Sequence, residues 1–220
     1  MCIRDSNGVD PNMFVPQEKD PGYYSTHGIQ DRFICSYVGT IGMAHGLEVT
    51  IEAAKILKER NRHDIAFCLI GDGARRKKLI REAKEADVME WVHFLGRLAK
   101  SEMPNVLANS DCLLVHLKGT DLFQTVIPSK IFETMAMQRP LIMGVRGESA
   151  EIVKQSKSGM QIAPDNGQDL ASAVIKMCDD KELYDSMCLH GRQFVSENYS
   201  RDVLASRLLK TIESVAGQES

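Results

Sequence analysis

The chain has 220 residues, 43% of them hydrophobic and 26% charged, which is typical of a soluble globular protein with one or two domains. Its formal net charge is -3 at pH 7, so it lacks the basic excess that general nucleic-acid binders and anionic-membrane binders carry. We therefore expect no nucleic-acid partner, and any recognition of phosphate must be local.

The cysteine pattern indicates a reduced, cytoplasmic protein. The six cysteines form no C-x-x-C pair and no Cys/His spacing that suits zinc. Cys35, Cys68 and Cys112 lie inside apolar runs, where a thiol behaves as a small buried hydrophobic group. No apolar run approaches the ~20 residues that span a bilayer, and residues 1–6 lack the apolar stretch of a secretory signal.

Three parts of the chain differ in pattern. Residues 1–6 fit no later element, and we interpret them as a non-native artefact, with native sequence beginning upstream. Residues 7–31 are rich in Pro, Gly and Asn and show no period, which is typical of a linker or of a loop that leads into a domain. Regular patterning starts at residue 32, so residues 32–217 are predicted to form one domain.

Within that domain, strand-like apolar runs alternate with amphipathic stretches. The predicted strands are 33–38, 65–70, 92–95, 112–116, 141–144 and 159–163. The predicted helices are 47–60, 75–86, 101–108, 129–137, 149–157, 169–178, 181–197 and 201–215. This alternation predicts a doubly wound α/β fold, with a Rossmann-like parallel sheet and helices on both faces. Ligands of such sheets bind beyond the carboxyl ends of the strands, which points to loops 39–46, 71–75 and 118–130.

The first of these loops is a candidate phosphate site. Gly39, Gly42 and Gly46 would let a ligand approach the backbone, and the amino end of the following helix favours negative charge. A tight turn that needs glycine for its φ angles explains the same residues equally well. His45 is a candidate for stabilising charge, although a single His in a turn is more often only a hydrogen-bonding residue.

The second loop carries Gly71 and Gly73, and four cations follow at residues 75–78. We interpret most of these cations as a solvated helix face, with at most one reaching a ligand.

The segment Pro128–Ala136 is the most informative of the three regions. Ser129 is predicted to cap a helix, and Lys130 lies in the first turn, where the helix dipole disfavours a cation. A cation at that position indicates an anionic ligand. Glu133 lies one turn later, where its carboxylate could accept two hydroxyl hydrogen bonds from a ribose, although a capping box or a salt bridge would use the same residue.

No D-x-D motif occurs, so the sequence implies neither a metal nor another cofactor. The charge that develops on a departing diphosphate would then be stabilised by helix amino ends and protein cations. Lys130 is the first candidate for that catalytic role and His45 is the second.

Together these motifs resemble the C-terminal domain of family 4 glycosyltransferases, which are retaining enzymes of the GT-B architecture. The resemblance covers about Asn7 to Val215. It is carried by Asn7–Asp10 with Phe14, the two glycine loops, Val92–Arg97, Pro128–Ala136 and Arg139–Ile142.

The resemblance implies a set of donor contacts. Glu133 matches the glutamate that holds the nucleotide ribose, and Arg97 follows the strand that borders the base. The glycines that would line the nucleotide and diphosphate pocket are Gly39, Gly42, Gly71 and Gly73.

The chain departs from the family at two places. Thr40 and His45 stand where the family often has an Arg and a Lys, and Thr125 replaces the first acid of the E-x7-E pattern. The Pro128–Lys130 variant resembles a bacterial envelope-polysaccharide branch, in which Lys130 would supply the missing cation.

We therefore expect a domain that binds a nucleoside diphosphate sugar for transfer to a saccharide or a lipid-linked acceptor in cell-envelope polysaccharide synthesis. The N-terminal acceptor domain is absent, so the fragment alone is expected to be inactive. Peripheral association with the inner face of the membrane stays open.

Three alternatives also stay open: a sugar-nucleotide epimerase, an NAD-dependent oxidoreductase and a non-catalytic nucleotide-binding module. The oxidoreductase is disfavoured because Ile41 interrupts the G-x-G-x-x-G fingerprint.

The last predicted helix, 201–215, either packs on the domain or crosses to the missing one. Crossing would leave five apolar residues partly exposed, namely Val203, Leu204, Leu208, Leu209 and Ile212.

Overall fold

A computed structural model of the chain describes residues 8–120 and 125–216. Four predictions lie outside the described residues: the artefact at 1–6, residue 7 of the lead-in segment, the middle of the third loop at 121–124, and residue 217.

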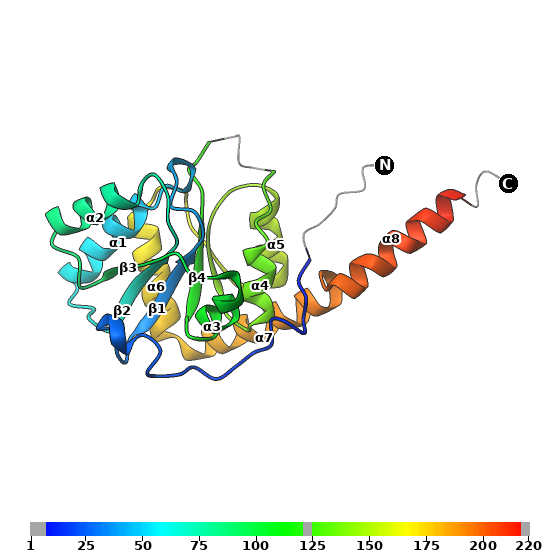
Figure 1. The fold of residues 1–220 in the computed structure, drawn as a ribbon, viewed down its shortest axis with the longest axis horizontal. Helices are drawn as coiled ribbons and strands as arrows, with labels where there is room; N and C mark the ends of the chain where they lie inside the picture. The colour runs from blue at the N-terminus through cyan, green and yellow to red at the C-terminus, as the bar shows by residue number, and fades with distance from the viewer. Residues whose placement is uncertain (1–7, 121–124, 217–220) are drawn as a thin grey trace.

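A parallel sheet of six strands forms the centre of the molecule, and the predicted doubly wound fold is confirmed (Figure 1). The strands are β1 (Phe33–Val38), β2 (Ile65–Ile70), β3 (Val92–Gly96), β4 (Cys112–His116), β5 (Leu141–Gly144) and β6 (Gly159–Gln161). Their order is β3-β2-β1-β4-β5-β6. The chain therefore reverses its direction of travel across the sheet between β1 and β4, and this switch point is where ligands of such folds bind.

The helices match the predicted ones to within a few residues. They are α1 (Glu48–Glu59), α2 (Arg76–Glu85), α3 (Met103–Ala108), α4 (Lys130–Ala136), α5 (Glu148–Ser156), α6 (Gly167–Asp179), α7 (Lys181–Asn198) and α8 (Arg201–Ala216). Short 3-10 turns occupy Ser25–His27, Met43–His45 and Lys100–Glu102.

Side chains alternate across the strands and so form a hydrophobic core on each face of the sheet. Cys35 and Tyr37 of β1 point into the core that α1, α2 and α6 cover. Ile34 of β1 belongs to the opposite face, where α3 contributes Val106. Beside it, α4, α5 and α7 cover β4 and β5 in a further cluster.

The described part of the lead-in segment is packed onto the domain. Tyr24 and Ile29 are buried against β1 and β2, so this segment completes one face of the sheet. At the start of the segment, Val9 pairs in parallel with Ser200, donating to Tyr199 O (3.0 Å) and accepting from Arg201 N (3.1 Å).

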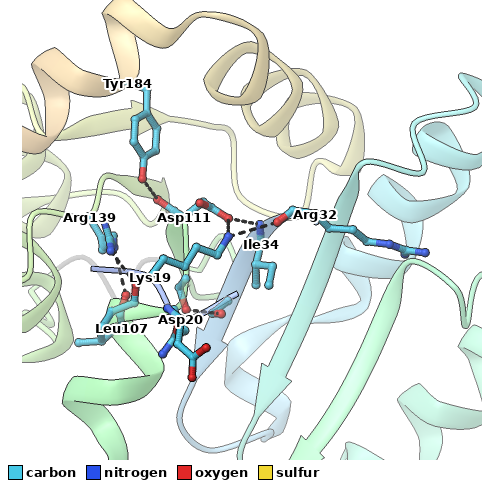
Figure 2. Close-up of polar contacts among 12 residues, drawn as sticks. Lys19, Asp20, Arg32, Ile34, Leu107, Asp111, Arg139 and Tyr184 are labelled. Carbon is cyan, nitrogen blue, oxygen red and sulfur yellow. Dashed lines mark hydrogen bonds and ion pairs between the residues drawn. The ribbon is translucent and has the colours of Figure 1, made fainter. Parts of the chain in front are cut away.

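A polar network holds the same segment at the amino ends of the strands (Figure 2). The Asp111 carboxylate accepts hydrogen bonds from Lys19 Nζ and from the backbone N–H of Ile34, both at 2.6 Å. Tyr184 donates its hydroxyl proton to the Asp111 carbonyl at 3.0 Å, and Arg139 donates to the Ala108 carbonyl at 2.6 Å. Asp111 therefore joins the lead-in segment, β1 and α7.

The last helix, α8, extends away from the domain (Figure 1). Leu208, Leu209 and Ile212 are 42%, 56% and 54% exposed, so this part of the helix does not pack on the core. The exposure agrees with the expectation for a helix that crosses to another domain. Within the described residues, no helix combines the length and the apolar character needed to cross a bilayer.

We predict that Asp111→Ala destabilises the chain by ~2 to 4 kcal/mol, because it leaves the buried Ile34 N–H and the Lys19 ammonium without their shared acceptor. Asp185→Ala is the control, because Asp185 pairs only with the exposed Lys181 on the surface of α7, and it should cost less than ~1 kcal/mol. Urea unfolding measures both variants, and equal losses would contradict this role of Asp111.

Candidate functional site

The first two predicted loops meet at the carboxyl edge of the sheet. Backbone hydrogen bonds continue the β1–β2 pairing beyond the strands, from Gly39 N to Ile70 O (2.9 Å) and from Ile41 N to Asp72 O (2.9 Å). Arg75 N then donates to Ile41 O at 3.0 Å. The two loops are thus fixed against each other before any ligand is present.

Glycine is required where the backbones of these loops touch. Gly71 has a φ of +147°, and a Cβ there would overlap the carbonyl oxygen of Gly39. A Cβ at Gly73 would lie 2.5 Å from Ile41 O. Gly42 differs, because its φ of -108° suits any residue. Packing between the loops therefore accounts for Gly71 and Gly73 without a ligand.

A cavity of about 450 Å³ opens between the carboxyl ends of β1 and β2 and the segment that follows β3. Gly39, Gly71 and the exposed Arg97, which were predicted as donor contacts, all line it. Lys100 also lines it and was not predicted. The remaining predicted residues, Gly42, His45, Gly46, Gly73, Ser129, Lys130 and Glu133, lie outside its lining.

Lys130 begins α4 and extends toward the end of β1. Its Nζ donates to Val38 O at 2.7 Å and lies 4.6 Å from the centre of the Tyr37 ring. Tyr37 in turn donates its hydroxyl proton to Thr40 O at 2.8 Å. The ammonium thus reaches the first glycine loop, beside Gly39, where it has a carbonyl and an aromatic face as partners.

Burial lowers the pKa of Lys130 to about 8, and the nearby charge of Glu133 opposes the shift. An ammonium with so low a pKa is poorly solvated, and it would gain more from an anionic ligand than a surface lysine does. Lys130 therefore has the electrostatic properties expected of a residue that binds an anion.

Ser129 differs from its prediction. It occupies the N-cap position of α4, but its backbone is helical there (φ -58°, ψ -30°), and no side-chain cap hydrogen bond forms within the described residues. A helical N-cap residue does not turn its hydroxyl back toward the N–H groups of the first turn. The proximity of the Ser129 hydroxyl lowers the pKa of the Glu133 carboxyl.

Glu133 is half-buried one turn into α4. Burial raises its pKa, while the charges of Lys100 and Lys130 lower it. Lys100 lines the cavity, and Lys130 reaches Gly39, which lines the same cavity. Glu133 therefore lies within electrostatic reach of both.

His45 ends the short turn before α1. Its ring meets the edge of Tyr37, with ring centres 5.9 Å apart. Burial, followed by the charge of Lys130, lowers the pKa of His45, so the ring is neutral at pH 7. A neutral ring donates a hydrogen bond but supplies no full charge.

The cations at 75–78 behave mainly as predicted. Arg75 pairs with Glu48 in the first turn of α1, Lys78 pairs with Glu82 at 3.2 Å, and Lys77 is exposed. None of the four lines the cavity at β1 and β2.

One set of possible metal ligands occurs within the described residues, namely Asp64, Cys178 and Asp179. Arg62 already bonds both carboxylates, at 2.8 Å to Asp64 and 2.7 Å to Asp179. Asp64 immediately precedes β2, and Cys178 and Asp179 end α6. The set therefore lies at the edge of the sheet opposite the candidate site and takes no part in that site.

Two site residues were missed from the sequence. Tyr37 stands two residues before the first glycine loop and is the one residue of β1 that combines an aromatic ring with a hydroxyl, and this signal could have found it. Lys100 had no comparable signal, because it follows an ordinary turn after β3.

The family described as Glycosyl transferases group 1 matches residues 25–194, which is well over half of the chain. The chain belongs to this family. The match begins inside the packed lead-in segment and ends in α7.

Relatives of this group 1 glycosyltransferase domain include two transferases of bacterial origin. Alpha-D-kanosaminyltransferase of Streptomyces kanamyceticus is 26% identical over 182 residues, which are 83% of this chain and 46% of the relative. Amylovoran biosynthesis glycosyltransferase AmsK of Erwinia amylovora is 24% identical over 172 residues, 78% of this chain and 42% of the relative. The chain thus spans about half the length of the relatives that it matches.

Solved structures show the same fold. The structure of Anabaena Alr3699/HepE in complex with UDP matches with a TM-score of 0.82 and 18% identity, over 94% of this chain and 56% of that one. The C-terminal domain of the group 1 protein LpcC from Francisella tularensis matches over its whole length, with a TM-score of 0.73, 23% identity and 88% of this chain covered. The domain is therefore the C-terminal half of a GT-B fold.

We predict that Gly71→Ala costs ~3 kcal/mol or more of folding free energy, because the added methyl group would occupy the position of the Gly39 carbonyl. Gly42→Ala in the neighbouring loop is the matched control. Its Cβ would meet nothing closer than 3.4 Å, so we expect a change within ~0.5 kcal/mol. Urea unfolding separates the two, and a tolerated Gly71→Ala would show that the loops can move apart.

Proposed function

We propose that this domain binds the nucleoside diphosphate sugar of a retaining family 4 glycosyltransferase in cell-envelope polysaccharide synthesis. The sugar would pass to a saccharide or a lipid-linked acceptor held by the missing N-terminal domain. Membership of the group 1 glycosyltransferases supports the reaction class, and the bound UDP in the Anabaena protein supports the class of donor.

The observation that carries the proposal is the position of Lys130. Its ammonium is held beside Gly39, at the carboxyl end of β1, where a parallel sheet of this topology binds its ligand. A diphosphate at the first glycine loop would lie within reach of this one charge and of the amino end of α1. As the leaving group departs, Lys130 would stabilise the growing charge without a metal.

The other predicted residues take supporting roles in this proposal. Glu133 accepts the ribose hydroxyls, Arg97 borders the base, and the neutral His45 donates a hydrogen bond rather than a charge. Gly39 and Gly71 keep the backbone open at the cavity where the nucleotide would enter. Ser129 orients Glu133 through its hydroxyl.

In this proposal the acceptor would be bound by the N-terminal half of the intact enzyme. The exposed apolar residues of α8, including Leu208, Leu209 and Ile212, would contact that domain in the intact enzyme. We expect this chain to bind its donor but to transfer sugar far more slowly than an intact enzyme.

We predict that the 220-residue chain binds one of UDP, GDP and ADP saturably and that Glu133→Ala weakens this binding by ~1 to 3 kcal/mol, because the ribose hydrogen bonds are lost. Isothermal titration calorimetry measures both. Glu182→Ala, on the exposed surface of α7, is the control and should leave the affinity unchanged.

Other outcomes of this titration would favour the alternative functions. Tight binding of NADH would favour an oxidoreductase, and conversion of a sugar nucleotide without acceptor would favour an epimerase. The absence of saturable binding to any of these nucleotides would overturn the donor-domain proposal.

We predict that diphosphate binding at about pH 8.5 is accompanied by the uptake of a proton by Lys130, because this amine is mostly neutral at that pH and the ligand raises its pKa. Below the Lys130 pKa of about 8 in the free protein, the ammonium is already charged, so the proton uptake declines as pH falls. Above this pKa, the affinity for the diphosphate falls with rising pH, because the amine has to be protonated when the ligand binds. Calorimetry in buffers of different ionisation enthalpy measures the uptake.

Lys130→Met should abolish this uptake, whereas Lys77→Met on the exposed face of α2 should preserve it. Equal uptake in all three proteins would show that another group titrates, and the proposed role of Lys130 would then be wrong.

A further inference from the structure

His116 joins two loops at the carboxyl end of β4, between the first glycine loop and the turn before α6. The side chain is buried, and both ring nitrogens have a partner. Nδ1 bonds the carbonyl oxygen of His45 at 2.7 Å, and Nε2 bonds the backbone N–H of Asp165 at 3.0 Å.

These partners fix the tautomer of the ring. A carbonyl only accepts and a backbone N–H only donates, so the proton must be on Nδ1 and the lone pair on Nε2. Burial lowers the pKa of His116, while the charges of Asp165 and Glu48 oppose the shift. The ring is therefore neutral. It donates a hydrogen bond from Nδ1 to one loop and accepts a hydrogen bond at Nε2 from the other.

The surroundings of His116 leave little room for movement. A Cβ at Gly144 of β5 would overlap the ring, and a Cβ at Gly46 would lie 3.0 Å from its Cε1 and 2.7 Å from Asp165 Oδ1. Two further contacts hold the same loops, because Lys118 N donates to Ala44 O (2.9 Å) and Gly119 N donates to Asp165 Oδ2 (3.0 Å). The imidazole is the only side chain among the described residues that bonds both loops.

We propose that His116 is a positioning residue of the donor site, which holds residues 42–46 in the conformation that receives the diphosphate. The proposal rests on the proposed function. The hydrogen bond from Nδ1 to His45 O carries the effect, because it fixes the loop immediately before α1, the 12-residue helix whose amino end faces that loop. His116 itself touches no ligand and acts through the loop.

Two substitutions separate the two hydrogen bonds. Asn at position 116 places an amide nitrogen where Nδ1 stands, so H116N keeps the bond to His45 O and loses the bond to Asp165. Gln reaches the position of Nε2, so H116Q keeps an acceptor for Asp165 N and loses the bond to His45. Each variant loses one hydrogen bond, so thermal stability alone should not distinguish them.

Ligand affinity should distinguish them. With the nucleoside diphosphate that the wild type binds best, H116N should bind within ~3-fold of wild type, and H116Q should bind ~10-fold more weakly. The corresponding nucleoside, which lacks phosphates, should bind all three proteins equally. Equal diphosphate affinity in H116N and H116Q, or an equal loss for the nucleoside, would overturn the role of His116 while leaving the donor site in place.

Amide hydrogen exchange of the wild type provides a test that does not depend on the folding of either variant. The diphosphate, but not the nucleoside, should slow exchange in residues 42–46. Diphosphate binding without this protection would overturn the role of His116. A wild type that binds no nucleoside diphosphate would overturn the proposed function and this inference together.

Discussion

Two loops touch through their backbones at the carboxyl ends of β1 and β2, and the shape of the site depends on this contact. The Gly39 carbonyl occupies the space that any side chain at position 71 would need. The hydrogen bond from Ile41 N to Asp72 O continues the sheet into the loops. Because both loops are held by main-chain atoms, the wall of the cavity is rigid, and side chains such as Lys130 are placed against a fixed surface.

The electrostatics of the site follow from the same packing. A chain with a net charge of -3 attracts no anion through its overall field, so the cations at the site, namely Lys130, Arg97 and Lys100, have to provide the local attraction. The ring of Tyr37 lies against the Lys130 ammonium, and the Tyr37 hydroxyl donates a hydrogen bond to the backbone carbonyl of Thr40. The neutral histidines at 45 and 116 contribute hydrogen bonds and packing but no positive charge.

Periodicity predicted the strands and helices well, because burial on both faces imposes apolar runs and amphipathic stretches that survive in a single sequence. It did not reveal side-chain direction. Ser129 has the residue type of a cap, yet its helical backbone turns the hydroxyl to Glu133. The lead-in segment lacks any period, yet Tyr24 is buried on β1 and β2. Contacts between residues far apart in the chain determine the burial of Tyr24, and no local pattern encodes them.

The pairing of Val9 with Ser200 has a mechanical consequence. The backbone that leads into the domain and the backbone that leaves it toward α8 are hydrogen-bonded side by side. A displacement of α8 would therefore pull on both connections at once, at this one corner of the domain.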